Sequence, residues 1–226
     1  AWALRALARG VELDPSIEET TGISLETLEG IMDGMKKARF GVILFGMGLT
    51  MTRGKHLNSE AVLALARDMN EHTRWSAKPM RGHGNVTGAD NVVSWSTGYP
   101  FGVHLGSGFP RFNPGEFTAS DVLARGEADA ALIIASDPMS NFSQPARDHL
   151  EGIPSVVLDP KLSDTARIAS VAFTTSTYGI NTGGTVYRMD DVPIPLRPAF
   201  DSPYKSDLEI LRGIESRIRQ RQLAES

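Results

Sequence analysis

The chain contains no cysteine among its 226 residues. This excludes disulfide bonds, thiolate-bound zinc, cysteine-ligated iron–sulfur clusters and a cysteine nucleophile within the chain itself. The absence of cysteine is also typical of cytoplasmic proteins, and we expect that location here.

Long apolar runs are missing as well, because no uninterrupted stretch approaches the roughly 20 residues of a membrane-spanning helix. Residues 1–5 lack the continuous apolar core of a signal peptide. The formal net charge is −4, which does not suggest a nucleic-acid or membrane partner. The chain begins at Ala1 without an initiator Met, inside a helix-like segment, so we expect further residues to precede it.

Common catalytic and metal-binding motifs are not present. No two histidines are spaced as i,i+2 or i,i+4 pairs, and there is no H-E-x-x-H motif. Ser107 lies between two glycines, but Leu105 occupies the first glycine position of the G-x-S-x-G elbow, so that pattern fails. As a metal ligand none is favoured, because each histidine taken alone is expected in a structural or surface role: His56, His72, His83, His104 and His149.

Hydrophobic periodicity predicts strands that alternate with helices. Short runs rich in Val, Ile and Leu are typical of parallel strands, the first of them buried, and segments with apolar residues three and four positions apart predict helices. The alternation indicates an α/β fold with parallel sheets flanked by helices. The predicted strands are 40–45, 129–135, 155–159 and 168–173, and the predicted helices are 25–35, 59–74, 119–127, 144–151 and a C-terminal helix from Ser206.

We expect three parts along the chain: an N-terminal segment (1–23), an α/β domain (24–200) and a C-terminal helix (201–226). Ser24 is a predicted N-cap, and Asn58 or Ser59 is another. The Pro-rich stretch that contains Pro193, Pro195 and Pro198 is expected to be an extended tail.

Residues 79–118 are rich in glycine, proline and aromatic residues and have no sustained period, so they predict a long loop. Such a loop is either functional or a covering segment whose aromatic residues pack on the core, and both interpretations stay open. Within it, residues 81–89 hold three glycines. Arg81 can bind an anion in two-pronged fashion and His83 can carry a proton, so a ligand is expected there.

The segment Gly46-Met47-Gly48-Leu49-Thr50 follows the first predicted strand and is half of a dinucleotide-binding fingerprint. Met51 stands where the third glycine belongs, so the full pattern fails and a nicotinamide or flavin site is not favoured.

Several stretches together resemble the molybdopterin oxidoreductases, and above all the B subunit of formylmethanofuran dehydrogenase. The resemblance rests on the strand-end segment 46–50, the R-G-H-G-N-V-T-G-A loop at 81–89 and the A-S-D-P turn that contains Asp137. It also rests on T-G-Y-P, F-P-R-F-N-P-G-E, D-T-A and G-T-V-Y-R-M-D segments, which contain residues Thr97, Arg111, Asp164 and Arg188.

The resemblance implies a truncated molybdopterin oxidoreductase-like fold. It also implies a tungsten or molybdenum pterin held through a Cys or selenocysteine, and an iron–sulfur cluster bound by N-terminal cysteines. This chain has no cysteine, so we expect no cofactor, no metal and no catalytic residue in the chain itself.

The favoured hypothesis is a redox-centre-lacking B subunit that resembles the one in bacterial formyltransferase/hydrolase complexes. Such a complex takes formyl groups from formyl-tetrahydromethanopterin through a methanofuran-like carrier to formate. The expected partners are an amidohydrolase-like subunit, a C subunit, a formyltransferase and the carrier. The residues expected at a vestigial cofactor site or a carrier-binding site are Gly46, Gly48, Thr50, Arg81, His83, Asn85, Arg111, Asp137 and Arg188.

Two alternatives remain open. One is the B subunit of an active tungsten- or molybdenum-dependent formylmethanofuran dehydrogenase, whose cysteines would lie before Ala1. The other is an independent doubly wound binding module with a small ligand at the Gly46–Gly48 turn.

Overall fold

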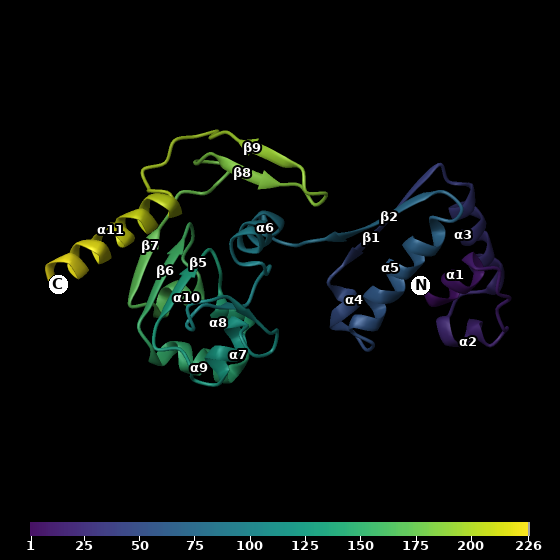
Figure 1. The fold of residues 1–226 in the computed structure, drawn as a ribbon, viewed down its shortest axis with the longest axis horizontal. Helices are drawn as coiled ribbons and strands as arrows, with labels where there is room; N and C mark the ends of the chain where they lie inside the picture. Colours follow the sequence, from purple (N-terminus) through teal and green to yellow (C-terminus); the bar gives the residue numbers. More distant parts are fainter. Residues whose placement is uncertain (226) are drawn as a thin grey trace. The chain divides into compact units, whose positions relative to one another are not determined.

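The computed structural model describes residues 1–225 and divides into two compact units, Ala1–Val86 and the part from Thr87 onward (Figure 1). Both units combine helices with a parallel sheet, as the alternating sequence pattern predicts. No helix within residues 1–225 is long and apolar enough to cross a membrane.

The first unit is a two-stranded parallel sheet packed against helices. α5 lies on the sheet, and α1 packs against both α3 and α5. Its core contains Ala8, Met32, Leu65 and Met69. The elements are α1 (Trp2–Ala8), α2 (Ile17–Thr21), α3 (Leu25–Lys37), β1 (Phe40–Gly46), α4 (Gly48–Met51), α5 (His56–Met69) and β2 (Arg74–Met80).

β1 is parallel to β2, as expected, but the prediction that it is buried is wrong for one of its faces. Gly41 is buried under the ring of Trp75, its partner on β2, and a Cβ at this position would lie 2.2 Å from that ring. Phe40, Val42 and Leu44 alternate with these inward positions and are 56%, 42% and 59% exposed. The described residues of this unit therefore cover only one face of the sheet.

The helix predicted at 59–74 is displaced towards the N-terminus. α5 begins at His56 and ends at Met69, and after a turn at residues 70–73 the chain forms β2 from Arg74. The sequence of β2 contains no apolar run, which explains why hydrophobicity did not reveal it. Asn58 lies in the first turn of α5 and donates to the carbonyl oxygen of Leu49 (2.8 Å), so it fixes the position of α4.

The second unit is built on a three-stranded parallel sheet with the order β5-β6-β7. The central strand carries the fully buried Val157 and Leu158. A neighbouring core gathers Leu123, Ala146 and Leu150 from α7 and α9. The elements are α6 (Val86–Thr97), β3 (Val103–His104), β4 (Arg111–Phe112), α7 (Ala119–Ala124), β5 (Ala131–Ile134), α8 (Pro138–Asn141), α9 (Gln144–Gly152), β6 (Ser155–Asp159), α10 (Asp164–Ile168), β7 (Val171–Thr174), β8 (Gly184–Tyr187), β9 (Pro193–Leu196) and α11 (Asp207–Glu225).

Two segments of the second unit are more regular than predicted. The long loop expected at 79–118 contains the twelve-residue helix α6, so the glycine-rich loop ends at Asn85. The expected Pro-rich tail contains β9, which pairs antiparallel with β8 through Pro193 and Tyr187. Proline is tolerated there because, within residues 1–225, β9 pairs with β8 on one side and with no strand on the other. The C-terminal helix is confirmed as α11.

Candidate functional site

The first group of predicted site residues lies where the strands of the first unit end. β1 and β2 end side by side, because Gly46 pairs with Met80 in the parallel register. Gly48 and Thr50 follow β1 directly, and Arg81 follows β2 directly. The two predicted segments therefore meet at the carboxyl edge of one sheet, where α/β proteins bind ligands. The hydroxyl of Thr50 donates to the carbonyl oxygen of Met47 (3.0 Å).

The loop after β2 has an unusual backbone. His83 and Asn85 adopt left-handed conformations, with φ angles of 63° and 57°. Such angles are uncommon outside glycine and cluster at functional loops. The side chains of Arg81 and His83 lie at the surface, and Asn85 is half-buried just before α6 begins. The structure thus presents Arg81 and His83 towards solvent on a constrained loop.

A second group lies in the second unit, where Asp137 follows β5. Its Oδ1 accepts hydrogen bonds from the hydroxyl of Thr165 (2.6 Å) and from the amide of Thr165 (2.9 Å). Thr165 is fully buried in α10, and its hydroxyl also accepts the amide of Met139 (3.0 Å). Two motifs of the sequence resemblance, A-S-D-P and D-T-A, therefore meet at one buried hydroxyl. Thr165 is not among the predicted site residues, although the D-T-A segment that contains it is part of the resemblance.

The carboxylate of Asp137 is held in its ionised form. Burial favours the protonated form, but the hydrogen bonds from Thr165 and Asp164 outweigh it and lower the pKa of Asp137 below its ordinary value. Ala135, two residues before Asp137, has a φ of 48°, which is rare for a residue with a side chain. The constrained backbone at Ala135 and the ionised carboxylate of Asp137, which can only accept hydrogen bonds, are suited to holding the end of β5 in place.

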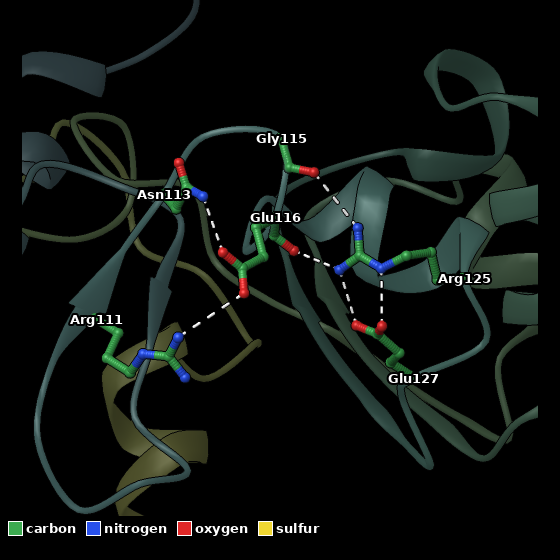
Figure 2. A network of polar contacts seen from close by, with 6 residues as sticks. All are labelled: Arg111, Asn113, Gly115, Glu116, Arg125 and Glu127. Carbon is green, nitrogen blue, oxygen red and sulfur yellow. Dashed lines mark hydrogen bonds and ion pairs between the residues drawn. The ribbon is translucent and has the colours of Figure 1, made fainter.

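The third group surrounds Arg111 on the short hairpin β3–β4, and Figure 2 shows its polar network. Glu116 lies 3.8 Å from the Arg111 guanidinium and accepts a hydrogen bond from the Asn113 side chain (2.8 Å). Arg125, which follows α7, donates to the carbonyl oxygens of Gly115 and Glu116 and pairs with Glu127. The loop that carries Glu116 is thus tied to the end of α7. No sequence signal pointed to Arg125.

Aromatic rings complete the surroundings of Arg111. The guanidinium lies over the ring of Phe117, with 4.9 Å to the ring centroid, and His104 stacks on the same ring at 4.9 Å. His104 also lines a cavity of about 460 Å³. Its Nδ1 is buried without a hydrogen-bond partner among the described residues. The hairpin therefore combines a half-exposed cation, an aromatic face and an imidazole beside a cavity.

Arg188 is in a different situation from Arg111. Its guanidinium makes a two-pronged ion pair with Asp190, which raises the pKa of Arg188. Arg111 has only a single long contact with Glu116, and 45% of its side chain is exposed. Of these two predicted carrier contacts, Arg111 has more capacity left for an incoming anion.

The donor set does not fit a metal centre held by this chain. The family resemblance implies thiolate ligands, and the sequence contains no cysteine. Within residues 1–225 there is no group of three or more His, Cys, Asp or Glu residues placed to hold a metal ion. We therefore assign no reaction step through tungsten, molybdenum or an iron–sulfur cluster to these residues.

The fold and these strand-end loops define a mixed α/β protein with helix-flanked parallel sheets. Within this class, the chain is homologous to the B subunit of formylmethanofuran dehydrogenase, which confirms the resemblance expected from the motifs. The B subunit of the tungsten-containing formylmethanofuran dehydrogenase 2 of Methanocaldococcus jannaschii is 42% identical over 220 residues, covering 96% of this chain and 50% of that protein. The corresponding protein of Methanococcus maripaludis is 40% identical over 218 residues, with the same coverage.

A bacterial relative is similar at lower identity. The B subunit of the formyltransferase/hydrolase complex Fhc of Methylorubrum extorquens is 29% identical over 186 residues, covering 81% of this chain and 49% of that protein. The crystal structure of that complex with methylofuran contains a chain of the same fold, with a TM-score of 0.73, 22% identity, and coverage of 97% of this chain and 57% of that one. No family model matches the sequence. The chain spans about half the length of the curated relatives it matches.

Proposed function

We propose that this chain forms part of a B subunit in an assembly that processes formyl groups on a methanofuran-type carrier. The part that this chain forms carries no redox ligands. The main observation in support of this proposal is the 42% identity to the B subunit of a formylmethanofuran dehydrogenase across 96% of the chain. The chain's own contribution is to hold partner subunits and to position the carrier.

The Arg111 hairpin is the part of the chain best suited to the carrier. Its cation has a single long contact with Glu116 and lies over the ring of Phe117, so it keeps donors that can bind a carboxylate. Arg81 supplies a second cation at the strand-end loop of the first unit. Both cations suit a carrier that bears carboxylates.

Two assemblies provide such a role, and different observations favour them. The similarity in sequence and fold to the B subunit of a formyltransferase/hydrolase complex favours a hydrolytic assembly. The higher identity to the tungsten-containing relatives, 42% and 40% against 29%, favours a dehydrogenase as the second candidate. A cysteine-free portion is compatible with both, because half of each relative lies outside the match.

Elemental analysis of the natively purified assembly separates the two candidates. Tungsten or molybdenum together with iron, at stoichiometric amounts, would identify the dehydrogenase. Formyl hydrolysis with these elements near zero would identify the hydrolytic assembly. A native preparation that contains this chain without any other polypeptide, and that neither hydrolyses nor oxidises the formylated carrier, would overturn the proposal.

A further inference from the structure

The last strand of the parallel sheet in the second unit has an open outer edge. β7 pairs with β6 and with no other strand in the described part of the chain. Thr175 donates its amide to Asp159 on the inner side, whereas Ser176 donates its amide to the carbonyl oxygen of Lys205 on the outer side (2.9 Å). Along a strand, the backbone N–H and C=O groups of successive residues point to alternate edges. The backbone groups of Ala172 and Thr174 therefore point to the outer edge, as does the amide of Ser176. The outer edge is thus closed at Ser176 and open before it.

A groove of about 940 Å³ is lined by residues of this edge and of α11, which begins near β7 and extends away from it in Figure 1. Phe173 and Thr174 form one wall, and residues 203–205 form part of the lining. The opposite wall is the apolar stripe of α11, which includes Ile214 and the half-exposed Ile218. An open strand edge and an apolar helix face therefore border the same space.

The rim of this groove is basic, in contrast to the chain as a whole. Lys205, Arg217 and Arg221 line it, and Glu209 is the one acidic residue among the lining residues described. The formal net charge of the chain is −4, so this concentration of positive charge is local. A segment with acidic residues would complement the rim, and its alternating apolar residues would cover Ile214 and Ile218.

We propose that the groove binds an extended, acidic and apolar segment of another subunit, which adds to the sheet as a strand beside β7. Backbone hydrogen bonds to Ala172 and Thr174 would continue the ladder that Lys205 begins at Ser176. Its carboxylates would pair with Arg217 and Arg221. The inference rests on the proposed function in one respect, namely that the bound segment belongs to another subunit of the same assembly.

The first test places a photo-crosslinking residue at position 214 of the full chain in the native assembly. The expected product joins Ile214's position to an extended acidic segment of a different subunit. The same residue at position 215 is the control, since Glu215 pairs with Arg219 and does not line the groove. In the assembly, the outward amides of Ala172 and Thr174 should also exchange hydrogen more slowly than in the isolated chain.

The second test reverses charges on the rim. Arg217→Glu combined with Arg221→Glu should lower the fraction of chain recovered with the partner subunits by about tenfold, more strongly at low salt. Arg219→Glu, outside the groove lining, should change it little. The inference would be overturned if position 214 crosslinked only to a second copy of this chain or to a helix. It would also be overturned if the double charge reversal left the assembly unaffected. Either result would leave the proposed function standing. A chain that purifies without partners would overturn both.

Discussion

Asp137 and Thr165 are separated by 28 residues in the sequence and share two hydrogen bonds, one from the hydroxyl and one from the amide of Thr165. This pair joins the end of β5 to the start of α10, and the same hydroxyl accepts the amide of Met139 at the start of α8. One buried threonine therefore fixes three segments at the carboxyl edge of the sheet.

Thr165→Val should destabilise the second unit although it conserves side-chain volume. It leaves the amide of Met139 without its acceptor and removes one donor from Asp137, which costs about 1–3 kcal/mol. Urea unfolding measures the change. Thr174→Val, at an exposed position on β7, is the matched control and should stay within about 0.5 kcal/mol. Equal effects of the two substitutions would contradict the role of the buried hydroxyl.

In the first unit, Arg5→Met should cost about 3 kcal/mol of unfolding free energy. Arg5 is 17% exposed and donates to Asp68, which is 7% exposed, at 2.5 Å, so its loss weakens the pairing of a buried carboxylate. Arg67 also contacts Asp68 (3.1 Å) but is 69% exposed. Arg67→Met should therefore cost less than about 1 kcal/mol. A larger loss for Arg67→Met than for Arg5→Met would refute this assignment.

The Asp68 pair also predicts how stability depends on pH. The hydrogen bond from Arg5 lowers the pKa of Asp68 in the folded state, and this effect exceeds the opposing effect of burial. The stability that Asp68 contributes is therefore fully present above its unfolded pKa, about 3.9, and is lost as the pH falls through the lower folded value. Urea unfolding of the wild type and Asp68→Asn at decreasing pH should give converging free energies. A difference independent of pH would exclude this linkage.

The sequence predicted those elements whose local signals agree with their tertiary surroundings. α3 has an N-cap, Ser24, that accepts the amide of Thr27, and an apolar stripe that faces the core. The run at 155–159 coincides with β6, the buried central strand. Where local signals are weak, tertiary contacts decide: β2 lacks an apolar run and forms because it pairs along the whole of β1.

The candidate site was predictable only in part. Strand-end segments such as Gly46–Thr50 can be located from sequence, because ligand sites in α/β folds lie at carboxyl ends of strands. Pairings such as Asp137 with Thr165 depend on where α10 lies against the sheet, which no local pattern encodes. The same holds for Arg125, whose partners at Gly115 and Glu116 are backbone carbonyl groups of a loop.

Arg125→Met should loosen the loop that carries Glu116 without unfolding the unit. The arginine donates to the carbonyl oxygens of Gly115 and Glu116, which would lose these bonds to the protein. The amides of Asn113, Gly115, Glu116 and Phe117 should exchange hydrogen faster, while those of β6 should not change. Arg167→Met, which removes an exposed arginine 3.8 Å from Asp164, is the control. Unchanged exchange at 113–117 would show that other contacts hold the loop.

The two arginines proposed as carrier contacts should differ in their effect on turnover by the native assembly. Arg111 has one long contact with Glu116 and retains donors for a ligand, so Arg111→Ala should raise KM for the formylated carrier by about tenfold, the effect of one charge-assisted contact. Arg188 is already engaged in two-pronged pairing with Asp190, so Arg188→Ala should change KM much less. In both variants the subunit composition should match the wild type. Unchanged KM in Arg111→Ala, or equal losses in both variants, would count against a carrier site at the β3–β4 hairpin.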